Sequence, residues 1–181
     1  MQIITGKFRG RKLVCPKGEE TRPTLGRVKE SLFSQIADKI ADARVLDLFA
    51  GSGAFGAECA SRGARRVVLV DQDKNAQEAI KKNLKDMDYE LLPLSAEHAL
   101  HRLFNTKSQF DIIFLDPPYD SELGFLALRL IAKFGLLSEN GIVVFETRNK
   151  NQLPKFPKSY IIRKERTYGT AQILILEQEN E

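Results

Sequence analysis

The sequence predicts an α/β fold, in which a mostly parallel, seven-stranded sheet carries helices on both faces and ends in an antiparallel hairpin. Three observations predict it. Short apolar runs alternate with amphipathic segments of helical length from Val45 onward, which is typical of strands joined by crossover helices. A glycine-rich turn separates the first apolar run from the segment after it. The last two runs are separated only by a turn at Gly169, which leaves no room for a crossover helix.

The first 43 residues predict a small extension ahead of one compact domain, residues 44–181. Residues 2–14 have the pattern of a β-hairpin that turns between Gly6 and Gly10. An irregular connector follows, and the apolar spacing then predicts an amphipathic helix from about Arg27 to Ala37. A chain of 181 residues is long enough for one domain with a sizeable core and hardly long enough for two.

The remaining elements follow from apolar runs and helical periodicity. The strands are expected at Val45–Phe49, Val67–Asp71, Tyr89–Leu94, Ile112–Asp116 and Ile142–Glu146, and the hairpin strands at Tyr160–Arg166 and Ala171–Glu177. The helices between them are expected near Ala57–Arg62, Lys74–Lys85, Ala96–Phe104 and Leu123–Phe134. Nearly continuous apolar strands indicate a sheet that is covered on both faces.

The turn from Gly51 to Gly56 joins a strand to a helix start, a geometry that brings a ligand against backbone N–H groups. Its glycines also fit the dinucleotide pattern G-x-G-x-x-G, so an NAD-dependent oxidoreductase stays open at this point. Asp71 ends the next strand twenty positions after Gly51, where a carboxylate can accept hydrogen bonds from ribose hydroxyls. Asp47 favours another interpretation, because a charged residue inside a strand buried on both faces is costly unless it has a function.

The fourth strand runs into the tetrapeptide Asp116-Pro117-Pro118-Tyr119. Because the carboxyl ends of neighbouring strands line one crevice, Asp116 should emerge beside the glycine turn. Two prolines fix two φ angles and remove two N–H donors, which leaves a rigid corner with a carboxylate, a carbonyl and an aromatic ring. Such a corner can accept both N–H bonds of an exocyclic amine while the ring stacks on the nucleobase. The alternative is an Asp-Pro turn that only ends a strand.

Charge is distributed unevenly along the chain. The net charge is +4, but residues 1–44 carry +5, residues 45–146 carry −4 and residues 147–170 carry +6. Basic flanks around an acidic centre indicate contact with a polyanion such as nucleic acid, and a merely solvated surface is the alternative. At the tip of the predicted hairpin, Phe8 lies among three cations, which suits phosphate contacts with a base stacked alongside.

Other features exclude several classes of protein. No apolar run approaches the roughly 20 residues that span a bilayer, and the N-terminus lacks the apolar core of a signal peptide. Cys15 and Cys59 are far apart and predict reduced thiols in the cytoplasm. His98 and His101 have no third ligand nearby, so no metal site is expected.

The motifs resemble those of a known family. The pattern Asp-x-x-x-Gly-x-Gly from Asp47 resembles the first motif of the S-adenosylmethionine (AdoMet) methyltransferases with Rossmann-like sheets, and the tetrapeptide resembles that of enzymes acting on exocyclic amines of bases. From Met1 to about Leu176 the chain resembles the RsmD family of 16S rRNA guanine-N2 methyltransferases. The resemblance rests on residues 4–13, Arg22-Pro23-Thr24, residues 27–30, 32–33 and 47–53, Glu58, residues 61–64, Asp71, residues 116–119 and Tyr168-Gly169-Thr170.

The resemblance implies AdoMet as the cofactor and N2-methylation of guanine 966 in 16S rRNA as the reaction. It implies catalytic roles for Asp116, Pro117, Pro118 and Tyr119. The implied cofactor-binding residues are Asp47, Phe49, Ala50, Gly51, Gly53, Asp71, Gln72, Ser95 and Ala96, and the RNA-binding residues are Lys7, Arg9, Arg11, Lys12, Arg22 and Arg27. The expected partner is naked 16S rRNA or an assembling small ribosomal subunit. The protein is expected to act as a monomer and away from any membrane.

Three departures from the family pattern stand out. Leu25-Gly26 replace a polar pair, and Asp71 replaces the commoner glutamate, which shortens the reach to the ribose. Cys59 takes the place of a small apolar residue. N6-adenine methylation of DNA uses the same type of tetrapeptide, although this chain carries no extra domain to read a DNA sequence. An RNA-binding module with a relict fold is a further alternative, which the filled catalytic positions disfavour.

Overall fold

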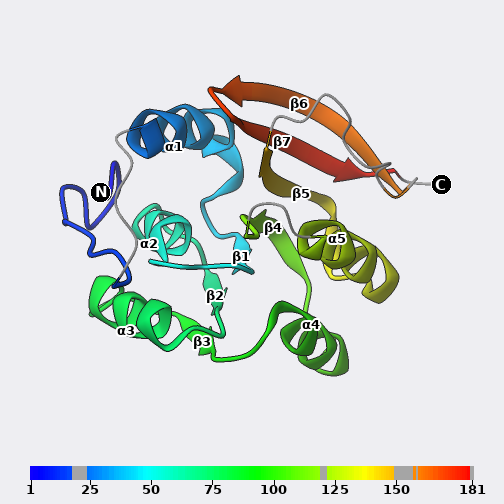
Figure 1. Cartoon of the computed structure of the whole chain (residues 1–181), viewed down its shortest axis with the longest axis horizontal. Coiled ribbons are helices and arrows are strands. Elements are labelled where there is room, and N and C mark those ends of the chain that lie inside the picture. Colours follow the sequence, from blue (N-terminus) through cyan, green and yellow to red (C-terminus); the bar gives the residue numbers. More distant parts are fainter. Residues whose placement is uncertain (18–23, 119–121, 149–156, 158, 180–181) are drawn as a thin grey trace.

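The computed structural model describes residues 1–17, 24–118, 122–148, 157 and 159–179 (Figure 1). Its single sheet has the strand order β3-β2-β1-β4-β5-β7-β6. Strands β1 to β5 run parallel, while β7 is antiparallel to both β5 and β6. The strands are β1 (Arg44–Asp47), β2 (Arg66–Val70), β3 (Glu90–Leu92), β4 (Phe110–Leu115), β5 (Leu137–Arg148), β6 (Tyr160–Tyr168) and β7 (Ala171–Gln178). The predicted fold class, including its C-terminal hairpin, is confirmed.

Helices cover both faces of this sheet (Figure 1). They are α1 (Thr24–Gln35), the 3₁₀ helix η1 (Ala37–Lys39), α2 (Ala54–Ser61), α3 (Lys74–Asn83), α4 (Ala96–Asn105) and α5 (Leu123–Phe134). One buried cluster joins α1, α2 and α3 to one face, and the other joins α4 and α5 to the opposite face. The alternation of β1 divides its side chains between them, with Val45 in the first cluster and Leu46 in the second.

Several element boundaries differ from the sequence prediction, among them the start of α1 at Thr24 instead of about Arg27. Two of the differences have physical reasons. Strand β5 starts at Leu137 rather than Ile142, because Leu137 pairs with Phe110 before the register shifts at a bulge. Residues 138–141 between them carry no apolar alternation that could have revealed the pairing. Helix α2 starts at Ala54, one turn earlier than expected, because Gly53 already serves as its N-cap residue.

The predicted N-terminal hairpin is a short, irregular pair rather than two regular strands. A single bridge joins Gln2 and Lys12, and Ile3 N donates to Arg11 O at 3.0 Å. We call residues 1–17 the N-terminal arm. The arm lies beside α2 and α3 in Figure 1, and its buried residues Ile3 and Leu13 belong to the same cluster as α1 and α2. The extension therefore shares a core with residues 44–181.

Glu58, a buried residue of α2, anchors the start of the arm. Its carboxylate accepts hydrogen bonds from Ile4 N at 2.8 Å and Thr5 N at 3.0 Å. The same carboxylate pairs with Lys29 at 3.1 Å and Arg62 at 2.9 Å. Burial alone would raise the pKa of Glu58, but the N–H of Ile4 and the two cations hold it below its ordinary value. A buried carboxylate in this setting stays charged and fixes the arm to α2.

Ser61 provides a second anchor one turn further along α2. Its hydroxyl accepts a hydrogen bond from Phe8 N at 2.9 Å and donates to Thr5 O at 2.7 Å. Gly6 has a φ of +90° and lies so close to α2 that a Cβ would come within 1.9 Å of Ser61 O. Only glycine fits there. Among the residues that the structure describes, no helix has the length and apolar character needed to cross a membrane.

Candidate active site at the carboxyl ends of the strands

The loops that follow β1, β2 and β4 meet at one edge of the sheet. Asp47 at the end of β1 pairs with Leu69 of β2 and with Phe114 of β4. Beyond the strand, Leu48 N still donates to Phe114 O at 3.1 Å, and Ala50 N donates to Val70 O at 3.0 Å. The glycine turn therefore leaves the sheet between the ends of its two neighbours, as expected for a ligand crevice in an α/β fold.

Unusual backbone geometry shapes the glycine loop, which we define as residues 49–53. Gly51 and Gly53 have φ angles of +53° and +73°. A Cβ on Gly53 would also lie 2.9 Å from a methyl carbon of Leu84 and 3.0 Å from one of Leu69. Gly53 N donates to Ala50 O at 2.7 Å, which closes the loop just before α2 begins. The loop thus brings backbone close to any ligand that lies against the start of α2.

Asp71 borders the glycine loop from the end of β2. Its Oδ2 accepts a hydrogen bond from Gly51 N at 2.8 Å, and its Oδ1 accepts one from Asp73 N at 2.9 Å. The side chain is half-buried. A carboxylate has about four acceptor positions, so two backbone donors leave capacity for a pair of hydroxyl groups. Asp71 can both hold the loop and bind a ribose.

Asp47 lies beneath the loop and is 1% exposed. Its Oδ2 accepts a hydrogen bond from Gly56 N, in the first turn of α2, at 3.1 Å. Burial raises the pKa of Asp47 to about 7, against the opposing effect of the Gly56 N–H. Its partner in this structure is therefore the helix that follows the loop, while its predicted contact with the amino-acid part of AdoMet stays a prediction.

The other predicted cofactor residues border the same edge of the sheet. Phe49 is half-buried and Ala50 is buried within the glycine loop, and Gln72 is exposed directly after Asp71. Ser95 is the N-cap residue of α4, and Ala96 is the first residue of that helix. This helix follows β3, which pairs with β2, so these residues lie on the far side of β2 from the glycine loop.

The catalytic corner follows β4. Asp116 is half-buried, Pro117 is buried and Pro118 is exposed, whereas Tyr119 lies outside the described residues. Since Asp47 pairs with Phe114, the continuation of the two strands brings Phe49 and Asp116 out at neighbouring points. The corner and the glycine loop thus leave the sheet from neighbouring strands at the same edge, where an α/β sheet has its ligand crevice.

Two residues that the sequence reasoning missed support this corner. Gly124 in the first turn of α5 is so tightly packed that a Cβ would lie 2.6 Å from the ring of Phe145 and 2.9 Å from Cγ of Pro117. Phe145 is paired with Leu115 and packs edge-on against Phe125, with ring centroids 5.3 Å apart. A glycine inside an apolar helical run was the available signal, because such a glycine destabilises a helix unless packing requires it.

The predicted RNA-binding cations do not behave alike. Lys7, Arg9 and Lys12 are exposed, and we call them the arm cations. The guanidinium of Arg11 instead donates to Lys85 O just beyond α3 and lies 3.8 Å from Asp86. It also lies 4.4 Å from the centroid of the Phe8 ring. Arg11 therefore ties the arm to α3, and a charge pattern could not distinguish this position from one that faces RNA.

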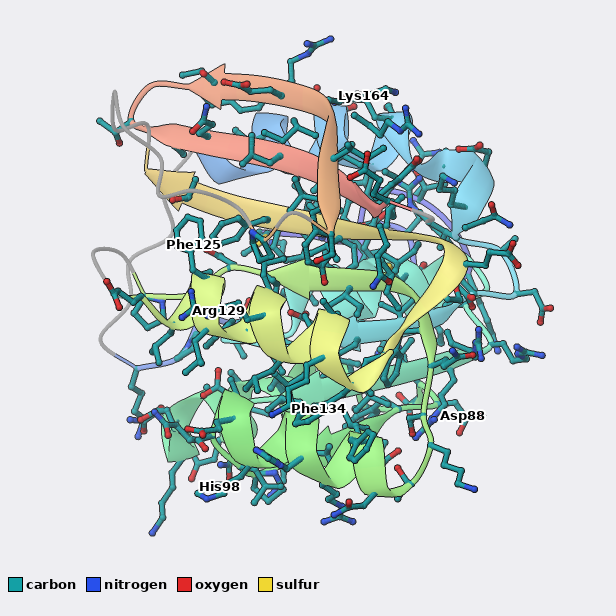
Figure 2. The ribbon with its side chains drawn as sticks, turned by 90° about the vertical axis from the view of Figure 1, so that its right-hand side faces the viewer. Asp88, His98, Phe125, Arg129, Phe134 and Lys164 are labelled. Carbon is teal, nitrogen blue, oxygen red and sulfur yellow. The ribbon has the colours of Figure 1, made fainter. Side chains whose placement is uncertain are left out.

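Further cations flank the sheet. Arg22 lies outside the described residues, as does the side chain of Arg27. On the edge strand β6, Lys164 (Figure 2) and Arg166 are exposed and belong to the basic segment 147–170. Within the described residues, no group of histidine, cysteine, aspartate and glutamate side chains could hold a metal ion.

Comparisons with known proteins place this chain in a family. A family model described as "Conserved hypothetical protein 95" matches residues 1–177. "Ribosomal RNA small subunit methyltransferase D" of Escherichia coli K12 is 32% identical over 179 residues, which cover 99% of this chain and 90% of the relative. The protein of the same name from Haemophilus influenzae is 36% identical over 173 residues, covering 93% and 89%. The chain belongs to the ribosomal RNA small subunit methyltransferase D family.

Solved structures agree with membership of the methyltransferase D family. The Escherichia coli protein described as "Putative methyltransferase yhhF" has a TM-score of 0.88 and 33% identity, covering 100% of this chain and 99% of that one. The Thermus thermophilus 16S rRNA N2 G1207 methyltransferase, solved with AdoMet and guanosine, has a TM-score of 0.67 at 20% identity, covering 90% of this chain and 45% of that one. The second likeness concerns the fold alone. The predicted RsmD resemblance is confirmed, and membership favours methyl transfer over the hydride transfer that the glycine pattern left open.

Proposed function

We propose that this protein is an AdoMet-dependent rRNA methyltransferase that methylates the exocyclic N2 of a guanine in 16S rRNA, at the family position 966. The observation that carries the proposal is that the Asp116-Pro117-Pro118 corner after β4 emerges beside the glycine loop after β1, at the strand ends where an α/β sheet has its ligand crevice. One side of this crevice suits a nucleoside with a free ribose, and the other suits an exocyclic amine. A cytoplasmic monomer is part of the same proposal.

On the cofactor side, the chain's own groups suit AdoMet. Asp71 accepts hydrogen bonds from the ribose hydroxyls, while Gln72, Ser95 and Ala96 border the base. The glycine loop and the first turn of α2 receive the amino-acid part against the backbone. Bound there, AdoMet supplies an electrophilic methyl group on a sulfonium.

The substrate side prepares the guanine amine for attack. The lone pair of this amine is delocalised into the ring, which makes it a poor nucleophile. Hydrogen bonds from the amine to Asp116 and to the carbonyl of Pro117 favour a pyramidal nitrogen and direct its lone pair toward the methyl group. Tyr119, placed by sequence alone, stacks on the base. Positioning of this kind contributes up to roughly 7–11 kcal/mol to lowering a barrier.

Methyl transfer forms one bond and breaks one. A nitrogen–carbon bond forms as the sulfur–carbon bond breaks, the sulfur electrons stay on the leaving thioether, and the nitrogen then loses one proton. The proton leaves to Asp116 or to water, because the methylated ammonium is strongly acidic. The guanine has to be unstacked or already single-stranded to reach the corner.

Methyl transfer from tritiated AdoMet tests the proposal. The substrates are 16S rRNA, small ribosomal subunits lacking the modification, and DNA, each followed by nucleoside analysis. We expect N2-methylguanosine from the ribosomal substrates. N6-methyl-2′-deoxyadenosine from DNA would overturn the proposal in favour of the adenine alternative, and an absence of transfer to every substrate would favour the relict RNA-binding module.

A variant connects the product to the site. Asp116→Ala should reduce transfer at least about 100-fold, because the carboxylate aligns the amine, while AdoMet binding stays within a few-fold of the wild type. Asp88→Ala is the matched control, since Asp88 is exposed and precedes β3 at the opposite edge of the sheet (Figure 2). Near-full turnover by Asp116→Ala would refute the assigned role of this carboxylate.

A further inference from the structure

One buried side chain joins the N-terminal arm to the glycine loop. Asn83, the last residue of α3, is 3% exposed. Its Oδ1 accepts a hydrogen bond from Val14 N at 2.8 Å, and its Nδ2 donates to Val14 O at 2.8 Å. The same Nδ2 donates to Ser52 O in the glycine loop, also at 2.8 Å. Asn83 thus holds two segments that are far apart in the sequence.

These partners determine the orientation of the amide. A backbone N–H can only donate and a carbonyl can only accept, so the oxygen of Asn83 must face Val14 N and both amide hydrogens must face the two carbonyls. A rotated amide would lose all three hydrogen bonds. Because the site is buried, water cannot readily replace them, and each unpaired group would lower stability.

The contact with Ser52 acts on a critical peptide unit of the loop. Asn83 holds the carbonyl of the Ser52–Gly53 peptide, and Ala50 O accepts its N–H at 2.7 Å. The plane of this peptide is therefore fixed from both sides. It lies between Gly51 and Gly53, the two positions with left-handed φ angles, where the backbone has the most freedom.

A second tie reinforces the first on the arm side. Arg11 donates to Lys85 O, two residues beyond Asn83 in the sequence. The arm is held at its other end by Glu58 and Ser61 of α2, the helix that begins directly after the loop. A displacement of the arm would therefore act on both helices that frame the loop.

We propose that Asn83 is a positioning residue of the cofactor site, through which RNA docking on the arm and cofactor binding at the glycine loop strengthen one another. The proposal rests on the proposed function, in which the arm cations contact RNA and the loop contacts AdoMet. A molecule that orders either segment reduces the ordering that the other ligand has to impose. By linkage, each ligand must then raise the affinity for the other by the same factor.

The experiment measures this coupling factor directly. S-adenosylhomocysteine replaces AdoMet so that no turnover occurs, and its Kd is measured by titration with and without saturating 16S rRNA transcript. We expect RNA to tighten S-adenosylhomocysteine binding by at least about fivefold in the wild type, the lower end of typical coupling. In Asn83→Asp, an oxygen replaces the amide nitrogen opposite the two carbonyls, and the factor should fall to about one.

Matched variants separate positioning from folding. Asn75→Asp makes the same change at an exposed position of α3 and should keep the wild-type factor. A merely structural Asn83 would lower the melting temperature and leave the factor unchanged, and that result would overturn the proposal. A wild-type factor of one would overturn it as well. Failure of the wild type to bind either ligand would instead refute the proposed function.

Hydrogen exchange in the wild type tests the same link if Asn83→Asp does not fold. S-adenosylhomocysteine should slow exchange of the Val14 amide, which Asn83 holds, more than exchange of the Asp42 amide, which donates to Gly63 O. Equal slowing at both amides would reflect only general stabilisation by the ligand and would overturn the coupling.

Discussion

Replacement of Asp71 gives a direct measure of the proposed cofactor site. The carboxylate lies at the end of β2 and accepts hydrogen bonds from Gly51 N at 2.8 Å and Asp73 N at 2.9 Å. Asp71→Ala removes the proposed ribose acceptors and, at the same time, one of the bonds that hold the glycine loop. Asp71→Asn keeps one acceptor oxygen in nearly the same place and removes the charge.

The magnitude follows from the kind of bond that is lost. A hydrogen bond to a charged group contributes about 1.5–3 kcal/mol when its partner stays in place. Because Asp71 is half-buried, water can replace part of the contact with Gly51, so most of the loss should concern the ligand rather than folding. We expect Asp71→Ala to weaken AdoMet binding by about 1.5–3 kcal/mol, roughly 10- to 150-fold, and Asp71→Asn to weaken it less.

Isothermal titration with AdoMet measures the effect, and thermal melting checks that each variant is folded. Asp88→Ala removes an exposed aspartate at the opposite edge of the sheet and should bind AdoMet like the wild type. An unchanged affinity in folded Asp71→Ala would remove Asp71 from the site and would contradict the assignment of this crevice to the ribose.

Three further predictions concern the arm, the catalytic corner and the buried acid. Replacing the three arm cations by alanine should flatten the log–log salt dependence of RNA binding by about 0.7 per lost phosphate contact, roughly two units in all, and matching slopes would exclude the arm as an RNA contact. Gly124→Ala places a Cβ 2.6 Å from the ring of Phe145 and 2.9 Å from Pro117. It should therefore destabilise the fold by about 1–3 kcal/mol, measured by thermal melting, and slow methyl transfer, measured by the tritium assay. Because burial raises the pKa of Asp47 to about 7, the folded state keeps a proton that the unfolded state loses near pH 4. The contribution of this group to the free energy of unfolding is therefore complete below pH 4 and is lost as the pH rises to 7. Denaturant unfolding measures this free energy, and in Asp47→Asn it should vary less with pH over this range than in the wild type.

The fold could be predicted because its signals are local and repeated. Helix α5 has the predicted bounds, Leu123–Phe134, since its apolar periodicity ends at Gly135, a glycine with a φ of +60°. The start of β5 could not be predicted, because it depends on a pairing with Phe110 across the sheet rather than on its own sequence. Strand pairing is set by tertiary contacts that no local pattern contains.

The candidate site likewise has parts that the sequence could predict and parts that it could not. The glycine loop and the Asp116 corner were found from motifs, because each needs particular residue types at fixed spacing. Arg11 was assigned to RNA by its charge, yet the structure gives its guanidinium partners beyond the end of α3. Charge reveals which side chains could meet a phosphate, and only the fold shows which of them are already engaged.

Asp47 and Asn83 show what supports a motif of this kind. The sequence argument held that a buried charge in a central strand requires a function, and the structure shows the carboxylate of Asp47 accepting a hydrogen bond from Gly56 N beneath the loop. Asn83 gave no signal, since an asparagine at the end of a polar helix is unremarkable by pattern, yet it fixes the Ser52 carbonyl. With Asp71 on Gly51 N, three polar side chains at the ends of β1 and α3 and directly after β2 hold the backbone around two left-handed glycines. Gly51 and Gly53 have no side chains that could stabilise the conformation of the loop, so its precision must come from neighbours whose positions the fold, and not the motif, determines.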